Sequence, residues 1–323
     1  MLYPLTFHPI FKERLWGGRT LERLYGKRLP PGVPIGESWE ISDRPGDVSV
    51  ISNGPLAGRD LRWLLEHHAE ALLGLAKLQG NRFPLLIKLL DAQEKLSLQV
   101  HPPVHKAVEL GGEPKTEMWY IADAAPGAEL FAGLNRGVTR AEFERKIRNG
   151  TVADCFHRVP VRAGDAMFLP SGRVHAIGAG LVIFEIQQNS DTTYRVFDWN
   201  RLGLDGKPRE LHVAESLASI DFDDFEPSLI ANAFTGDASV QRRPLVQDSL
   251  FAVEALQLKA ASGLPLKPRV MQIVACLSGN LCVEAGAVKT ALSPGEFCLA
   301  PACLDGVQVC AISATSLLRV EAG

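Results

Sequence analysis

Two short segments carry the most restrictive pattern in the chain. The first, Lys95 to Pro102, alternates at the two-residue period of a β-strand. Its apolar side chains fall on one face and its polar side chains on the other, namely Leu96, Leu98 and Val100 against Ser97, Gln99 and His101. The second runs from Gly164 to His175 with the spacing G-x5-P-x-G-x2-H. An apolar face backed by ligand-capable side chains is what a small β-barrel needs to hold a metal ion in its mouth.

The second segment resembles the second metal motif of the cupin family. Between the two segments, Glu117 follows Lys115 and precedes an aromatic strand. The candidate metal ligands are therefore Gln99, His101, Glu117 and His175. Gln99 has an alternative role, because an amide is an uncommon zinc ligand and can instead form hydrogen bonds within the site. This donor set suits Zn²⁺, but also Mn²⁺, Fe²⁺, Co²⁺ or Ni²⁺, so ligand chemistry alone does not choose zinc.

Composition narrows the class of protein. The chain has 323 residues, which favours two domains, and 46% of them are hydrophobic, which suffices for a core. A net charge of −3 argues against nucleic acid or an anionic membrane as the main partner. The N-terminus lacks a basic segment followed by an apolar run, and no stretch is long and apolar enough to span a bilayer. We therefore expect a cytoplasmic protein.

The cysteines support that expectation. None of the six forms a C-x2-C pair, and all of them lie beyond residue 150, at Cys155, Cys276, Cys282, Cys298, Cys303 and Cys310. This distribution argues against a disulfide framework and favours reduced thiols. We expect them to be small buried residues rather than metal ligands.

Short β-branched or aromatic runs separated by Gly and Pro predict a mainly β fold of two cupin-like jelly-roll barrels with a few short helices. Helices are expected from Asp60 to Leu73, from Thr139 to about Gly150, and from Leu211 to Ser219. Thr139 and Glu142 have the spacing of a capping box.

The C-terminal part repeats the G-x5-P spacing from Gly295 to Pro301, but Gly306 stands where the histidine would be. The prediction is a catalytic metal-binding barrel over residues 1–240 and a degenerate, metal-free barrel over residues 241–323.

A longer set of motifs resembles the type I mannose-6-phosphate isomerases in their short bacterial form. They are Arg14 to Gly18, Ile35 to Ser42, Pro84 to Leu90, and the run from Gly164 to Arg201 that contains Thr-Thr-Tyr-Arg. The resemblance covers about residues 3 to 220. It implies a zinc enzyme that interconverts mannose 6-phosphate and fructose 6-phosphate, with zinc on Gln99, His101, Glu117 and His175.

The same resemblance assigns further roles. Arg195 is expected to be catalytic. Lys88 and Lys115 match two lysines of that family, and Ser97 matches a serine that lies near the substrate in the family. Moving a proton between C1 and C2 requires an electrophile, a base and a cationic group for the phosphate. Buried lysines can bind anionic oxygens or shuttle protons, so Lys115 is also a catalytic candidate. The proton-abstracting base has several candidates.

Other readings stay open at this point. An ordinary salt bridge to Asp198 or Glu185 is the structural alternative for Arg195, and each lysine can be a surface cation. A cupin-like barrel can also bind sugar without turnover or host an oxygen-using Fe²⁺ site. The expected partner is a small-molecule sugar phosphate, and the chain is expected to be a monomer or a homodimer.

Overall fold

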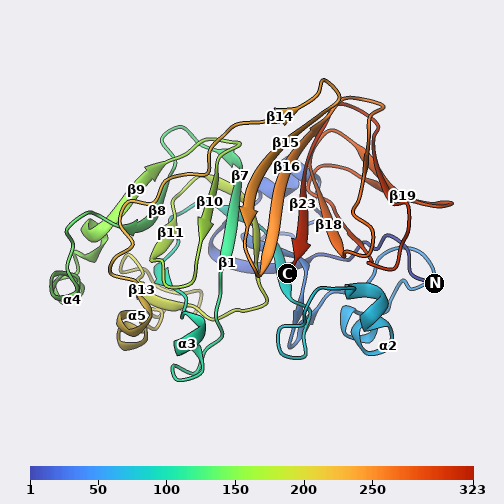
Figure 1. Ribbon diagram of the computed structural model, residues 1–323. Helices are drawn as coiled ribbons and strands as arrows, with labels where there is room; N and C mark the ends of the chain where they lie inside the picture. The colour runs from blue at the N-terminus through green and yellow to red at the C-terminus, as the bar shows by residue number, and fades with distance from the viewer.

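The computed structural model describes residues 1–323 and consists of four stacked antiparallel β-sheets with five short α-helices (Figure 1). We number the sheets I to IV. Sheets I and II contain strands from the first two thirds of the chain, and sheets III and IV contain the strands that follow. A separate two-stranded sheet consists of β3 (Asp43–Arg44) and β4 (Asp47–Val48). The mainly β, cupin-like fold predicted from the sequence is confirmed.

Sheets I and II face each other in the first part of the chain. Sheet I has the order β1 (Ile10–Gly18), β2 (Ile35–Ile41), β5 (Leu85–Ala92), β12 (Leu181–Gln188), β7 (Glu117–Ala124), β10 (Ala166–Leu169). Sheet II has the order β13 (Tyr194–Phe197), β6 (Leu98–Val100), β11 (His175–Ile177), β8 (Glu129–Leu134), β9 (Phe156–Pro160).

Sheets III and IV face each other in the C-terminal part, coloured orange to red in Figure 1. Sheet III has the order β14 (Thr235–Gly236), β15 (Val240–Gln247), β16 (Phe251–Leu258), β23 (Thr315–Ala322), β18 (Gln272–Ser278), β21 (Phe297–Ala300). Sheet IV has the order β17 (Gly263–Pro265), β22 (Gln308–Ala311), β19 (Leu281–Ala285), β20 (Val288–Leu292).

The three predicted helices are present. They are α2 (Leu61–Leu73), α4 (Arg140–Arg148) and α5 (Val213–Ser219), and the sequence did not signal α1 (Thr20–Tyr25), α3 (Val104–Ala107) or the 3₁₀ turn η1 (Val152–Cys155). Asp60 caps α2 by accepting a hydrogen bond from the Trp63 amide at 2.7 Å. Thr139 caps α4 through the Glu142 amide at 3.2 Å. The Glu142 carboxylate instead lies 3.7 Å from Lys146, so only half of the predicted capping box forms.

Apolar and polar side chains alternate along the strands, which places one apolar layer between each two neighbouring sheets. Leu90, Trp119 and Ile183 belong to the layer between sheets I and II. On the opposite face of sheet I, Leu89 and Phe184 pack in a larger layer with Leu299 of sheet III. A third layer fills the space between sheets III and IV. Because the large layer joins the two parts of the chain, sheets I and III are packed back to back.

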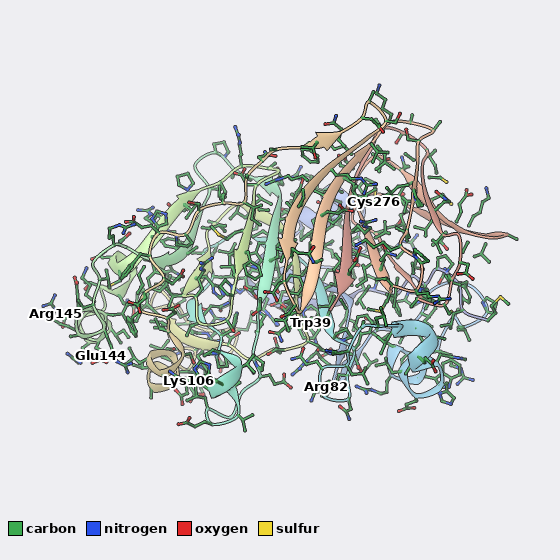
Figure 2. The ribbon with its side chains drawn as sticks, in the orientation of Figure 1. Trp39, Arg82, Lys106, Glu144, Arg145 and Cys276 are labelled. Carbon is green, nitrogen blue, oxygen red and sulfur yellow. The ribbon has the colours of Figure 1, made fainter.

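The outer face of sheet II is covered by helices. Phe143 of α4 is fully buried, and its ring lies 5.9 Å from that of Phe156 on β9. Figure 2 shows Glu144 and Arg145 on the solvent side of the same helix. A helix with one buried face and one charged face is typical of a layer that closes a sheet against water. No helix of the protein has the length and apolar character needed to cross a membrane.

Candidate metal centre and active site

Three adjacent strands of sheet II bring separate sequence motifs into one row. Gln99 on β6 lies directly opposite His175 on β11 and, on its other side, opposite Arg195 on β13. Directly opposed residues of antiparallel strands place their side chains on the same face. The row therefore turns an amide, an imidazole and a guanidinium toward sheet I, where Glu117 begins β7.

Alternation in the first motif holds only in part. β6 begins at Leu98, and Leu98 and Val100 pack on the outer face of sheet II as predicted. Leu96 precedes the strand and packs instead against the layer between sheets I and II, so its predicted position beside Leu98 is wrong. The Leu96 backbone amide donates a hydrogen bond to the Ile177 carbonyl at 2.9 Å, and the chain turns there before β6 begins.

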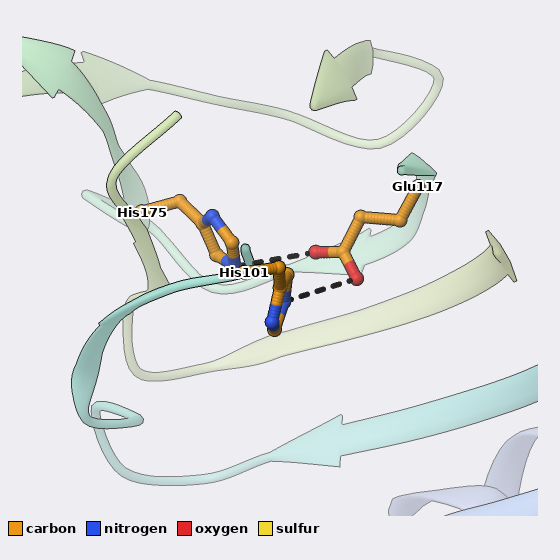
Figure 3. A group of neighbouring side chains, drawn as sticks. All are labelled: His101, Glu117 and His175. Carbon is orange, nitrogen blue, oxygen red and sulfur yellow. Dashed lines mark ion pairs between the residues drawn. The ribbon is translucent and has the colours of Figure 1, made fainter. Parts of the chain in front are cut away.

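His101, Glu117 and His175 form a buried cluster whose ligand atoms all lie within 4.8 Å of one another. Figure 3 shows both imidazoles directed at the Glu117 carboxylate, with His175 Nε2 3.3 Å from Oε1 and His101 Nε2 3.6 Å from Oε2. The three residues are at most 1% exposed. Three sequence-distant candidates are thus brought together.

Backbone contacts orient the two imidazoles. His101 Nδ1 lies 2.8 Å from the Thr192 carbonyl, and His175 Nδ1 lies 2.9 Å from the Arg173 carbonyl. A carbonyl can only accept, so each Nδ1 carries the proton and each Nε2 presents a lone pair. Metal-ligating histidines are held in this way in proteins.

The cluster passes a test for metal binding, because its inner polar atoms are incompletely paired. His101 Nε2 and Glu117 Oε1 are buried and form no hydrogen bond, and Glu117 Oε2 is buried with the Lys115 ion pair as its partner. Burial lowers the pKa of His101 to about 3, and burial also lowers that of His175. Burial works to raise the pKa of Glu117, but the Lys115 ammonium together with His101 and His175 outweighs it and holds that pKa well below its usual range. Two neutral imidazoles and one carboxylate are the charge states that a divalent cation requires.

Gln99 reaches the edge of this cluster. Its amide nitrogen lies 3.3 Å from His175 Nε2, and its oxygen accepts a hydrogen bond from Ser97 Oγ at 3.4 Å. As the amide is placed, its nitrogen faces the imidazole. A half-turn of the amide would exchange nitrogen and oxygen, which is the change that a ligand role requires.

A chain of alternating charges extends from the cluster along the inner face of sheet I. Lys115 Nζ lies 2.8 Å from Glu117 Oε2 and 4.0 Å from Glu185 Oε1, and Lys88 Nζ lies 3.2 Å from the same Glu185 atom. Glu37 Oε2 follows, 3.8 Å from Lys88 Nζ. Both lysines are buried, so the reading of either as a surface cation is wrong.

The pKa values along this chain follow from burial and pairing. Burial works to lower the pKa of Lys115, but Glu117 and Glu185 together, with a smaller effect of Asp191, outweigh it and raise that pKa above its ordinary value. The lowered lysine pKa that would suit a neutral proton shuttle is therefore not found at Lys115. Burial raises the pKa of Glu185. At Glu37, Lys88 and Arg14 overcome the effect of burial and lower the pKa to about 2.

A pocket of about 550 Å³ opens beside the charged chain. Its lining includes four predicted site residues, Lys88, Gln99, Lys115 and Arg195. Ser97 is buried and does not line the pocket, and neither do the three residues of the cluster. The volume is in the range of small-molecule sites, and the cluster lies directly behind Gln99 and Lys115.

Arg195 is not held by an ordinary salt bridge. Its Nη1 donates to the Glu210 carbonyl at 2.9 Å, and its buried Nε has no partner. The two acids considered as its alternative partners pair elsewhere, because Asp198 binds Arg201 and Arg209 and Glu185 pairs with Lys88. Burial lowers the pKa of Arg195, with Arg209 adding to the effect. The guanidinium nevertheless stays charged.

Sequence reasoning gave no functional role to two acids of the pocket wall, Glu37 and Glu185. Glu185 is the single charged residue in the buried strand β12, and it lies directly opposite Lys88 on β5 and Trp119 on β7. A lone charge inside a continuous apolar run is the signal that was available for both Lys88 and Glu185. Glu37 is hydrogen-bonded by Trp39 Nε1 at 2.6 Å and Arg14 Nε at 2.9 Å.

A β-sandwich with a buried His-Glu-His cluster behind a charged pocket defines the class of cupin-type proteins with a candidate metal site. Comparisons with known proteins narrow the class. Residues 5–120 match the family model described as "Phosphomannose isomerase type I, catalytic domain". The chain belongs to the type I mannose-6-phosphate isomerases.

Individual relatives show how far the similarity extends. The chain is 44% identical over 223 residues to "Mannose-6-phosphate isomerase ManA" of Bacillus subtilis, covering 68% of each chain. It is 35% identical over 302 residues to "Mannose-6-phosphate isomerase" of Streptococcus mutans, covering 93% of each chain. The crystal structure of mannose 6-phosphate isomerase from Bacillus subtilis superposes with a TM-score of 0.89, 31% identity and 99% coverage of both chains. The apo form from Salmonella typhimurium, at 19% identity and a TM-score of 0.74 with 100% coverage of both chains, shares the fold.

Proposed function

We propose that this protein interconverts mannose 6-phosphate and fructose 6-phosphate through an enediol intermediate. The observation that carries the proposal is the set of unpartnered atoms on His101 and Glu117 beside a pocket lined by Lys88, Lys115 and Arg195. Family membership supplies the substrate class, since the relatives are named as isomerases of mannose 6-phosphate.

The proposed cofactor is one Zn²⁺ per chain, held by His101, Glu117 and His175 with Gln99 as the fourth ligand. A divalent ion in that position supplies a Lewis acid that polarises an oxygen of the sugar. The unpartnered lone pairs of the cluster support this assignment. Zinc is one of several ions that accept these donors.

The protein residues then have separate roles. Arg195 is proposed to stabilise the negative charge that develops on the enediol oxygens, because its buried Nε lacks a partner and its charge is fixed. Lys88 and Lys115 are proposed to bind anionic oxygens of the substrate. The raised pKa of Lys115 keeps it an ammonium, which makes it a proton donor rather than an abstracting base.

Ser97 is proposed to act through Gln99. Its hydroxyl lies 3.4 Å from the Gln99 amide oxygen and is buried. After the half-turn that a ligand role requires, the same hydroxyl would accept a hydrogen bond from the Gln99 amide nitrogen. A residue in that position orients a ligand rather than contacting the sugar. This modifies the substrate contact that the resemblance implied for Ser97.

A coupled assay tests the proposal. Purified protein is dialysed against chelator, reloaded with Zn²⁺, Mn²⁺, Fe²⁺ or Co²⁺, and assayed for fructose 6-phosphate formed from mannose 6-phosphate. Turnover is expected only with metal and with the phosphorylated sugar, and free mannose serves as the control. Oxygen consumption that depends on Fe²⁺ would favour the oxygenase reading, and sugar phosphate binding without product would favour a binding module.

A further inference from the structure

Two cysteines lie directly opposite each other on sheet IV, far from the pocket. Cys282 on β19 pairs in register with Cys310 on β22. Their chain neighbours, Leu281, Val283, Val309 and Ala311, all belong to the apolar layer between sheets III and IV, and neither cysteine does. Because side chains alternate along a strand, both thiols lie on the outer face of sheet IV.

The ladder geometry sets the distance between the two residues. The Ile312 amide donates to the Asn280 carbonyl at 2.9 Å, two positions along from the cysteine pair. Hydrogen-bonded pairs recur every second residue in an antiparallel ladder, so Cys282 and Cys310 form such a pair, with Cα atoms about 5.5 Å apart. Disulfides span Cα separations of about 4.4 to 6.8 Å.

The flanking residues leave room for the two sulfur atoms to meet. On the next strand, Ala291 lies opposite Cys282, and on the other side Gly263 lies opposite Cys310. Neither neighbour has a side chain beyond Cβ that would stand between the thiols. Cys282 is 8% exposed and Cys310 is half-buried, so Cys310 is the thiol that a reagent reaches first.

We propose that Cys282 and Cys310 form a dithiol site that small-molecule disulfides convert into a cross-strand disulfide. The Cys310 thiolate attacks the reagent, which forms a mixed disulfide on Cys310 and releases one reagent thiol. The Cys282 thiolate then attacks the Cys310 sulfur and releases the second reagent thiol. Each cysteine loses its proton to solvent as it becomes the attacking thiolate, the two cysteines are oxidised together, and the reagent is reduced to two thiols.

The other cysteines do not compete for this partner. Cys155, Cys276 and Cys298 are fully buried, and Cys298 points into the layer between sheets III and IV. Cys303 is exposed, but it lies after Pro301 on a loop and has no cysteine opposite it. The pairing is therefore specific to the two residues that share a ladder position.

Reaction is expected to be slow near neutral pH. Burial raises the pKa of both thiols, the Glu284 carboxylate raises it further, and the Lys289 ammonium opposes that rise. Because the thiolate is the attacking form, the exchange is expected to be faster in a mildly alkaline solution.

The experiment uses the whole chain and oxidised glutathione. After incubation at about pH 8, the protein is denatured, its free thiols are alkylated, and its peptides are sequenced by mass spectrometry. Loss of two of the six thiols is expected, with a cross-link between Cys282 and Cys310. Cys282→Ser is expected to retain a stable glutathione adduct on Cys310, whereas the matched control Cys303→Ser still forms the cross-link.

A thermal scan gives a second readout. The bridge closes a loop of the unfolded chain, so the cross-linked wild-type protein is expected to unfold about 5 °C higher, and dithiothreitol should reverse the shift. Cys282→Ser should show no shift. The proposal is overturned by a persistent adduct on wild-type Cys310, by a bridge that includes Cys298 or Cys303, or by thiol loss at Cys303 alone.

Discussion

At the scale of single residues, the pocket is defined by charged groups that are buried yet incompletely paired. Arg195 keeps one hydrogen bond to a backbone carbonyl, while its Nε is buried without a partner. Glu185 Oε1 is likewise buried without a hydrogen bond, although Lys88 lies 3.2 Å away. Unpaired buried polar atoms are costly to folding. We propose that substrate and metal complete the pairing of these atoms.

Replacing Arg195 tests its proposed role. Arg195→Ala is expected to lower kcat by about 10²-fold or more, because a preorganised charge near the enediol oxygens is lost. Arg195→Lys should recover part of that loss, since it restores the charge without the planar donors. Metal content and melting temperature should stay near the wild-type values. An unchanged kcat, or a melting temperature that falls together with activity, would assign Arg195 a structural role.

Glu37 provides a test through pH. Its folded pKa of about 2 lies below its ordinary value of 4.5, so the folded state binds fewer protons than the unfolded state between these values. The contribution of Glu37 to stability is therefore present above about pH 4.5 and is lost as the pH falls toward 2. Its full size is on the order of 3 kcal/mol.

Glu37→Gln isolates that contribution. Urea unfolding of the wild-type protein and the variant at several pH values should show a stability difference that is largest near neutrality and shrinks below about pH 4.5. A difference that stays constant across this range would show that the Glu37 carboxylate does not have the lowered pKa on which the argument rests.

At the scale of elements, α4 shows how local sequence signals and tertiary packing combine. Thr139→Ala removes the hydrogen bond to the Glu142 amide and is expected to lower the free energy of unfolding by about 1 kcal/mol. Thr139→Ser keeps the hydroxyl and should be nearly neutral. Chemical denaturation of both variants checks this, and equal losses in the two would mean that the cap is not the relevant contact.

Elements with a strong local code could be predicted from the sequence. The α2 and α4 boundaries follow from a capping residue and a terminal Gly or Asn, and the strands that carry Glu117 and Glu185 follow from apolar runs. Short elements such as α1 and α3 lack such codes. The position of Leu96 also depends on a tertiary contact with Ile177, which no local pattern contains.

Some features of the site could likewise be predicted from the sequence, and others could not. His101 and His175 could be predicted because each ends a motif of fixed spacing, and Glu117 because it follows Lys115. The pairing of Lys88 with Glu185 could not, because it depends on the register between β5 and β12. Register between distant strands is set by the whole sheet rather than by neighbouring residues.

At the scale of the whole molecule, we propose that residues 1–240 form the catalytic barrel and residues 241–323 a metal-free barrel that supports it. β14 lies before that boundary but pairs with Gln241 and Arg242 of β15, so sheet III begins a few residues before residue 241. The two parts share the apolar layer between sheets I and III, where the rings of Phe184 and Phe297 lie 5.6 Å apart. The N-terminal segment also joins sheet III, because Leu5 and Leu299 exchange backbone hydrogen bonds.

This shared layer predicts a single cooperative unfolding transition. All five tryptophans lie before residue 200, so tryptophan fluorescence reports on the first part alone. Leu299→Ala, in the second part, is expected to lower stability by about 2–5 kcal/mol and to lower the fluorescence midpoint with it. The exposed control Ile312→Ala should have little effect. A fluorescence midpoint that Leu299→Ala leaves unchanged would show that the two parts unfold independently.

The most direct test of the account measures bound metal and turnover of mannose 6-phosphate in the same samples of wild-type protein, His101→Ala, His175→Ala and His105→Ala. His105 lies exposed on α3 and is the matched control. The account predicts about one divalent transition-metal ion per chain with activity in the wild type and in His105→Ala, and loss of most metal and most activity in the other two. Stoichiometric metal with near-normal turnover in either His101→Ala or His175→Ala would contradict it.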